Sequence, residues 1–152
     1  MSLRHAVLLL PLVAACRTTV DFDAPTPAIV QSVEPLPVTL SNELRRLRIK
    51  GAGAGVKSAY RVGNVLTPLF ASHDGRAFLN LVEASLAQER EGEGWNARFH
   101  LVLALQREGR SETFTIDERA FSFTSATEAG RLAAERGVES LYAAVRRRLG
   151  ER

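Results

Sequence analysis

Residues 95–123 read WNARFHLVLALQREGRSETFTIDERAFSF, and this stretch decides most of the fold that the sequence predicts. Apolar residues recur at every second position of its first half, at Phe99, Leu101, Leu103 and Leu105, which predicts a strand over 95–106. Glu108-Gly109-Arg110 is a turn signal, so we expect the next strand, over 112–123, to pair antiparallel with the first.

The second strand of this hairpin contains two apolar pairs in opposite phase. Phe114 and Ile116 share one phase, whereas Phe121 and Phe123 share the other. One face of a regular strand cannot bury both pairs, because side chains alternate between faces. We therefore expect a β-bulge near Glu118–Ala120.

Helices are expected on both sides of the hairpin. Ser125-Ala126-Thr127-Glu128 is a capping-box sequence, which predicts a helix running to about Leu149. The apolar stripe of this helix is Ala134, Val138, Leu141 and Val145. Before the hairpin, Asp74 is a candidate cap for a helix from about Gly75 to Arg90, which Gly92 and Gly94 would end. Its stripe is Phe78, Val82 and Leu86, joined by Leu79.

The segment before residue 71 is less regular. Leu40, Leu44 and Leu47 have helical spacing after a candidate cap at Ser41, but alternation around Ile49 favours a strand over 44–50. A second strand is expected over Tyr60–Phe70. The predicted order is then ββαββα, a single α+β domain over residues 38–152 with an antiparallel sheet of about four strands and two helices on one face.

Gly51-Ala52-Gly53-Ala54-Gly55-Val56-Lys57-Ser58 invites comparison with a phosphate-binding loop. The Walker pattern needs Lys directly after its second framing Gly, and here Val56 intervenes. Val56 also occupies the place of the third Gly in a Rossmann pattern. We therefore predict a flexible hairpin loop and no nucleotide partner.

The N-terminus has the composition of an export signal. Met1–His5 carry one firm positive charge and no acid, and Ala6–Ala15 form an uncharged, mostly apolar run. This run of about ten residues is shorter than the roughly 20 that a membrane-spanning helix needs. Polarity then changes abruptly at Cys16-Arg17.

Val13-Ala14-Ala15-Cys16 resembles the lipobox of bacterial lipoproteins, although Val stands where Leu is commonest. The resemblance implies that residues 1–15 are a signal peptide and that Cys16 receives a diacylglycerol thioether and an N-acyl chain. The alternative is an ordinary signal peptide with an incidental cysteine. Cys16 is the only cysteine of the chain, so no intrachain disulfide can form.

Residues 16–37 are expected to be a lipidated tether. The segment contains four prolines, which favour extended backbone without ladder hydrogen bonds. A short edge strand around Ile29, Val30 and Val33 is the alternative. In enteric-type bacteria an Asp after the lipidated Cys retains a lipoprotein in the inner membrane. Arg17 stands there, so the resemblance implies the periplasmic face of the outer membrane.

Size and element order are similar to those of small α+β envelope lipoproteins, such as the YajG-type and lipopolysaccharide-assembly types. The expected function is a non-catalytic, membrane-anchored envelope lipoprotein that binds a protein partner or supports outer-membrane assembly or maintenance. With 20 basic and 17 acidic residues, the charge does not favour nucleic acid.

Two alternatives for function remain open in the sequence. His73 and His100 are the candidate histidines of a periplasmic hydrolase, but no nucleophile motif accompanies them. No metal site and no cofactor are expected, because further ligands are lacking. Two basic clusters either stabilise local structure or contact anionic lipid or lipopolysaccharide phosphates. These clusters are Arg45, Arg46 and Arg48 with Lys50, and Arg146, Arg147 and Arg148.

Overall fold

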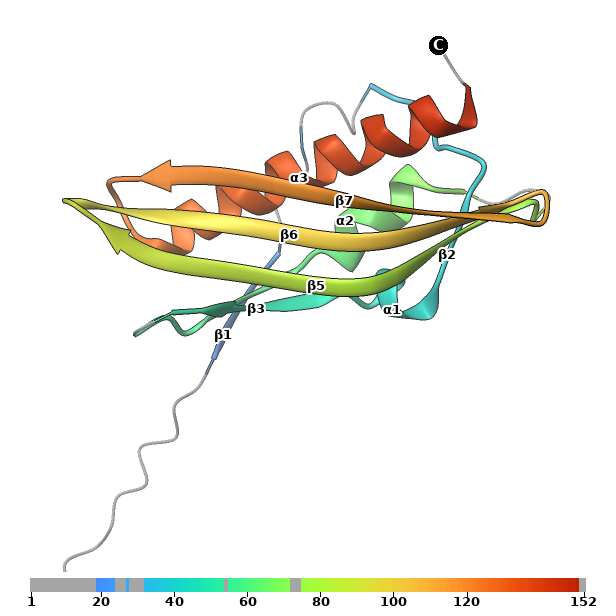
Figure 1. Cartoon of the computed structure of the whole chain (residues 1–152). Coiled ribbons are helices and arrows are strands. Elements are labelled where there is room, and N and C mark those ends of the chain that lie inside the picture. The colour runs from blue at the N-terminus through green and yellow to red at the C-terminus, as the bar shows by residue number, and fades with distance from the viewer. Residues whose placement is uncertain (1–18, 24–26, 28–31, 54, 72–74, 151–152) are drawn as a thin grey trace, which may run out of the picture.

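The computed structural model describes residues 19–23, 27, 32–53, 55–71 and 75–150, which form a mixed sheet and one long helix (Figure 1). The strands are β1 (Val20–Asp23), β2 (Thr39–Leu40), β3 (Arg48–Ala52), β4 (Ser58–Arg61), β5 (Ala77–Glu91), β6 (Gly94–Arg107) and β7 (Arg110–Ser122). The helices are α1 (Asn42–Arg45), α2 (Gly63–Leu66), a following 3₁₀ turn η2 (Thr67–Leu69), and α3 (Ala126–Leu149).

The strand order is β1-β4-β3-β5-β6-β7, with β2 beside β5 in a sheet of seven strands. β1 is parallel to β4, and β2 and β3 are both parallel to β5. The predicted four-stranded antiparallel sheet with two helices on one face is therefore wrong. The ββαββα order fails because a predicted helix is a strand and the N-terminal half supplies parallel pairs.

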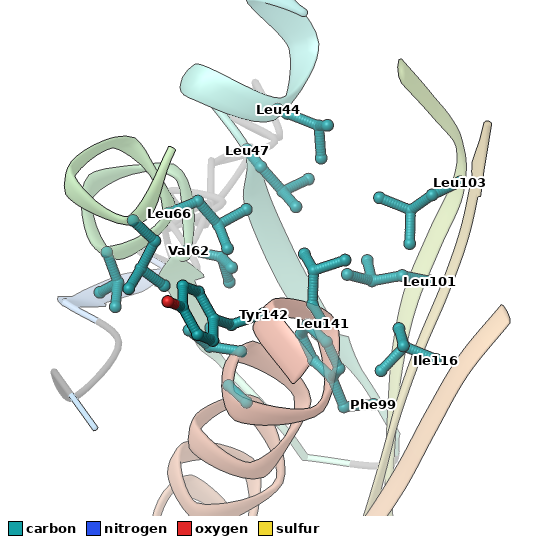
Figure 2. Close-up of a cluster of buried hydrophobic side chains, with 14 of the residues drawn as sticks. Leu44, Leu47, Val62, Leu66, Phe99, Leu101, Leu103, Ile116, Leu141 and Tyr142 are labelled. Carbon is teal, nitrogen blue, oxygen red and sulfur yellow. The ribbon is translucent and has the colours of Figure 1, made fainter. Parts of the chain in front are cut away.

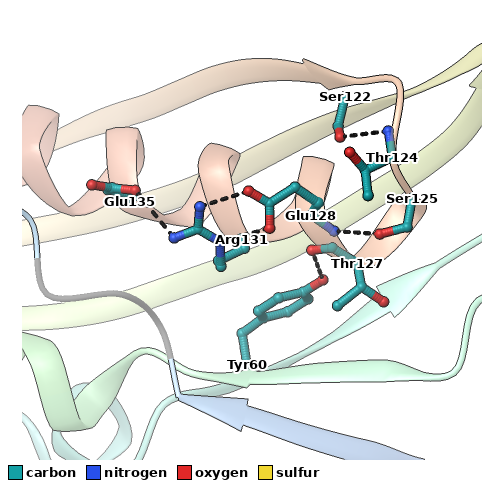
Figure 3. Close-up of polar contacts among 8 residues, drawn as sticks. All are labelled: Tyr60, Ser122, Thr124, Ser125, Thr127, Glu128, Arg131 and Glu135. Atoms are coloured by element: carbon teal, nitrogen blue, oxygen red, sulfur yellow. Dashed lines mark hydrogen bonds and ion pairs between the residues drawn. The ribbon is translucent and has the colours of Figure 1, made fainter.

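The hairpin and the last helix are confirmed. β6 and β7 pair antiparallel from Trp95 opposite Ser122 to Arg107 opposite Arg110. At the start of α3, the Ser125 hydroxyl accepts a hydrogen bond from the backbone N–H of Glu128 at 3.1 Å (Figure 3). The Glu128 carboxylate accepts two hydrogen bonds from Arg131. The predicted stripe of α3 is buried in full.

The predicted helix over 75–90 is wrong, because this segment is strand β5. Its inward residues alternate on each side of an irregularity between Leu81 and Glu83: Ala77, Leu79 and Leu81 before it, then Ala84, Leu86 and Gln88. The extra residue makes one inward step three positions long, which imitates helical spacing. Phe78 and Val82, assigned to a buried stripe, are 42% and 62% exposed.

The bulge predicted near Glu118–Ala120 is also wrong, because β7 pairs with β6 without a register shift. Phe114 and Ile116 face the core, and the conflict of phase is resolved by leaving the other pair outside. Phe121 and Phe123 are 41% and 76% exposed and stack edge to face, with ring centroids 4.8 Å apart.

Two elements before residue 71 also differ from expectation. Residues 38–50 could form a helix or a strand by their sequence pattern, and the structure contains a short piece of each. Ser41 caps the short helix α1, and strand β3 begins at Arg48. The strand predicted over 60–70 ends at Arg61 and is followed by α2 and η2. The buried residues of this part have helical spacing: Val62, Val65, Leu66 and Leu69.

The hydrophobic core lies between the sheet and α3, which covers one face of β6 and β7 (Figures 1 and 2). Phe99, Leu101 and Leu103 of β6 point toward Leu141 of α3, and Leu44, Leu47 and Leu66 extend the same cluster (Figure 2).

Buried polar contacts tie the first turn of α3 to the sheet. The Tyr60 hydroxyl donates to the Thr127 carbonyl oxygen at 2.8 Å, and the Gln88 amide donates to the Ala126 carbonyl oxygen at 2.5 Å (Figure 3 shows the first). Burial raises the pKa of Tyr60. These bonds fix where α3 begins over the sheet.

Part of the segment expected to be a tether lies in the sheet. Val20–Asp23 form β1, and Leu36 makes an isolated bridge with Phe70. Cys16, the signal sequence and Ile29 and Val30 lie outside the described residues. Among the residues that are described, no helix is long and apolar enough to cross a membrane.

Candidate functional site: a groove between strand β7 and helix α3

A groove of about 420 Å³ runs between the outer edge of β7 and α3. Five consecutive strand residues, Phe114 to Glu118, line one side, so the groove follows the strand backbone. The helix contributes Ser140, Ala143, Ala144, Arg147 and Arg148. Because these helix residues recur every three to four positions, one face of α3 overhangs the edge of the sheet.

β7 is the last strand of the sheet, so its second edge has no neighbour among the strands that the structure describes. The loop Glu108-Gly109 has φ of 51° and 74°, the left-handed values of a type I′ turn. In such a hairpin Arg107 and Arg110 form a hydrogen-bonded pair, and bonded pairs then recur at every second residue. The backbone N–H and C=O groups of the odd-numbered residues 111–121 therefore point to the outer edge.

One end of this edge is occupied by a side chain of α3. Arg136 donates a hydrogen bond to the Arg119 carbonyl oxygen at 2.6 Å, as the derived edge pattern requires. At the other end, the Arg148 guanidinium lies 4.0 Å from the centre of the Phe114 ring and bonds Glu112 at 2.9 Å. Arg148 contacts only side chains of β7 there, so it leaves the outer backbone groups of residues 111–117 free.

The structure separates the predicted basic clusters. Arg147 and Arg148 line the groove, and Arg146 precedes them in the last turn of α3. Arg147 is exposed, and its side chain has no hydrogen bond or ion pair with any residue that is described. It is therefore a charge available to a ligand at one end of the groove.

The other cluster lies on α1 and β3. Arg48 pairs with Asp21 of β1 at 2.6 Å and lowers the pKa of that carboxyl by hydrogen bonding. Arg45 and Arg46 are exposed around the end of α1, and Lys50 is exposed on β3. No described contact joins this cluster to Arg147.

The sheet face opposite α3 carries a row of a serine, a histidine and an aspartate. Ser85 of β5, His100 of β6 and Asp117 of β7 lie directly opposite one another across the three strands. His100 Nδ1 lies 3.2 Å from Asp117 Oδ2. A hydrolytic triad also needs the serine hydroxyl hydrogen-bonded to the histidine, and the described residues include no such bond.

Asp117 is shared between His100 and a stronger partner. Arg98 Nε donates to both carboxylate oxygens at 2.9 and 3.0 Å, and Arg98 Nη2 also bonds Oδ2. These bonds, with a smaller contribution from His100, lower the pKa of Asp117 from 3.8 to about 2. The Asp117 carboxylate therefore acts mainly as the ion-pair partner of Arg98, and its contact with His100 is the weaker of the two.

This lowered pKa predicts a pH-dependent contribution to stability. A carboxyl whose folded pKa is lowered stabilises the fold above its unfolded pKa, and the effect is lost as pH falls through the folded value. We expect Asp117→Asn to lower the free energy of unfolding at pH 7 by about 0.5–1 kcal/mol, discounted for solvent screening. Urea titrations at several pH values should show this difference shrinking from pH 4 toward pH 2. Glu93→Gln, at the β5–β6 turn, should show no such trend, and a constant difference for Asp117→Asn would contradict the assignment.

The described residues hold no group of three or more His, Cys, Asp or Glu side chains that could bind a metal ion. The glycine-rich segment after Lys50 completes β3 and leads into the antiparallel β4. His73 and its neighbour Asp74 lie outside the described residues, so His100 is the candidate histidine that can be placed.

Sequence reasoning missed the groove. Ala143, Ala144 and Ser140 give no chemical signal in the sequence, and Arg147 was noted only as part of a basic run. The groove could have been predicted only from the position of β7 at the end of the sheet. That position follows from the strand order, which in turn requires β5 to be identified as a strand.

Comparison with known proteins gives no family for this chain. No protein-family model matches, and no curated protein matches either. One solved structure, described only as "Crystal structure of uncharacterized protein", matches over 87% of this chain and 99% of its own, with 10% sequence identity and a TM-score of 0.47. A likeness of this degree carries no argument about fold or function.

Proposed function

We propose that this chain is an exported envelope lipoprotein, anchored through lipid on Cys16 at the periplasmic face of the outer membrane, that binds a protein partner and is not an enzyme. Its task would be to support the assembly or maintenance of the outer membrane. The observation that carries partner binding is the unpaired edge of β7 beside the groove under α3. Exposed strand edges pair readily with other chains.

The anchoring part of the proposal rests on the lipobox resemblance. A lipidated domain stays beside the membrane, so its partner is expected to be another envelope protein. Neither a nucleotide nor a nucleic acid is proposed as a partner.

Site-specific photo-crosslinking in the native envelope tests partner binding. A photoreactive residue at Ala143, inside the groove, should give one discrete adduct with an envelope protein. The same residue at Glu93, at the β5–β6 turn, should give none. If a folded chain gives no adduct from Ala143, or the same adduct from both positions, the groove is not a partner site.

A periplasmic hydrolase is the second candidate function, because Ser85, His100 and Asp117 share one row on the open sheet face. Replacing His73 and His100 with Ala separates the two functions. A folded double variant that loses the native phenotype would favour the enzyme, whereas partner binding predicts that the phenotype survives.

Binding of anionic lipid is a third candidate, because Arg45, Arg46 and Lys50 are exposed. It predicts strongly salt-dependent binding of the unlipidated domain to anionic vesicles, since salt screens exposed charges. The protein-partner proposal does not require that binding.

A further inference from the structure

We propose that the groove binds an extended segment of the partner protein as an added antiparallel strand on β7, with a carboxylate of that segment paired to Arg147. This inference rests on the proposed function and names the class of ligand. It requires three properties of the site: free backbone groups, room for side chains beneath α3 and a charge that selects the ligand.

The backbone groups are those of Ser111, Thr113, Thr115 and Asp117, whose N–H and C=O groups point away from β6. β7 contains neither proline nor a bulge along this stretch, and these are two usual devices that protect an edge strand. An added strand would continue the regular ladder of the β5–β6–β7 sheet.

The room for side chains comes from the overhang of α3. Alternate side chains of an added strand would point into the groove, beside Ile116 and against Ala143. The small side chains of Ala143 and Ala144 leave this space open, so apolar ligand residues fit there. The opposite side chains of the ligand would face solvent.

Charge favours a carboxylate in the ligand. The exposed guanidinium of Arg147 has no described partner, whereas that of its neighbour Arg148 is held by Glu112 and the Phe114 ring. Arg147 lines the groove, so an acidic ligand side chain that enters the groove would meet its positive charge. A basic side chain there would face uncompensated positive charge.

A second copy of this chain fits the same edge poorly. Arg136 closes the edge at Arg119, so symmetric pairing would centre on the free residues 111–117, near Phe114. The two Arg147 side chains would then approach each other across the symmetry axis. Like charges at such a position are destabilising, which favours a ligand without its own α3.

Fluorescence anisotropy with the full chain in detergent tests the inference. The probe is a labelled peptide, Val-Thr-Val-Thr-Val-Thr-Glu, and the matched control peptide carries Lys in place of Glu. We expect the Glu probe to bind at least tenfold more tightly than the Lys probe. Arg147→Glu should reverse this preference, which a merely structural role of Arg147 would not produce.

Two variants test the strand geometry. Thr115→Pro removes an outward N–H but no bond to β6, and we expect it to weaken the Glu probe at least tenfold, whereas Thr115→Ala should bind within twofold of wild type. Ala143→Trp fills the groove without touching the strand backbone and should also weaken binding tenfold, while Ala104→Trp, on the opposite sheet face, should not. If Thr115→Pro fails to fold, the comparison of Ala143→Trp with Ala104→Trp still tests whether the ligand binds in the groove.

Three results would overturn the inference. One is equal binding of the two probes, and another is unchanged binding by folded Thr115→Pro and Ala143→Trp. The third is a wild-type dimer that Thr115→Pro converts to a monomer, since a second copy would then occupy the edge. If crosslinking from position 143 to the envelope partner persists in the Thr115→Pro background, strand addition fails while the proposed function stands.

Discussion

Gly137→Leu should destabilise the protein by about 3 kcal/mol or more, the upper part of the range for overpacked cores. Gly137 is buried on the face of α3 that meets β6, and an added Cβ atom would lie 2.2 and 2.3 Å from two ring carbons of Phe99. Phe99 is fully buried, so its ring has no free direction in which to move. The gain in helix propensity over glycine, roughly 1 kcal/mol, is smaller than this cost.

Thermal and urea unfolding would measure the effect, which should lower the melting temperature by about 10 °C or more. Arg147→Leu, an exposed change in the same helix, is the control and should change stability by no more than about 0.5 kcal/mol. Phe99→Ala alone should cost about 3–5 kcal/mol. The double variant Phe99→Ala with Gly137→Leu should be no less stable than Phe99→Ala, because the leucine occupies the space of the ring. Additive losses, or a stable Gly137→Leu protein, would show that α3 does not pack on Phe99.

The hairpin and α3 were predictable because their signals are local. Alternation in β6, a turn with glycine in the left-handed region and a serine cap each act within a few residues. The close approach of α3 to the sheet was not predictable. Gly137 has no side chain to place in a pattern, and its role appears only when Phe99 is found opposite it.

β5 was misread because one irregularity changes the phase of a long strand. On either side of it the inward residues alternate normally, but the step from Leu81 to Ala84 joins them at helical spacing. The pairing of β5 with β6 overrides this local pattern, since tertiary contacts decide between weak local preferences. The same pairing moves Phe78 and Val82 to the open face.

The N-terminal half depends even more on distant partners. β2 has two residues and β3 has five, and each is held in part by pairing with β5. Such short segments carry little periodicity, so the sequence left a helix and a strand as alternatives around Leu44. The order of the strands, and with it the exposed edge of β7, follows from these pairings and could not be read from the chain.

The candidate site was therefore predicted only in fragments. The sequence indicates the run Arg146–Arg148 by its charge. Arg147 and Arg148 both line the groove, but the Arg148 guanidinium is held by Glu112 and Phe114. Of these two side chains, therefore, only that of Arg147 is available to a ligand. The apolar lining of the groove consists of Phe114, Ile116, Ala143 and Ala144, residue types that are common in hydrophobic cores and give no sign of a binding site in the sequence. The proposed function of this site depends on the position of β7 at the end of the sheet.

Cys16→Ser should abolish stable membrane attachment of the mature chain, the largest effect that we expect of any single substitution. The lipobox resemblance implies that Cys16 would carry a diacylglycerol and an N-acyl chain. Each buried methylene contributes roughly 0.8 kcal/mol, so one chain holds a protein marginally and two or three hold it in effect permanently. Serine lacks the thiol that forms the thioether, so the variant should accumulate as an unprocessed or mis-cleaved precursor.

Mass spectrometry of the wild-type protein should find Cys16 at the N-terminus with added acyl mass and no peptide from residues 1–15. Thr18→Ser, two residues away, is the matched control and should leave processing unchanged. Arg17→Asp should keep the lipid but, in an enteric-type host, move the protein from the outer to the inner membrane, because sorting there depends on the residue after the lipidated cysteine. A mature protein that begins at Arg17, or a soluble one with a free Cys16 thiol, would rule out the lipoprotein assignment.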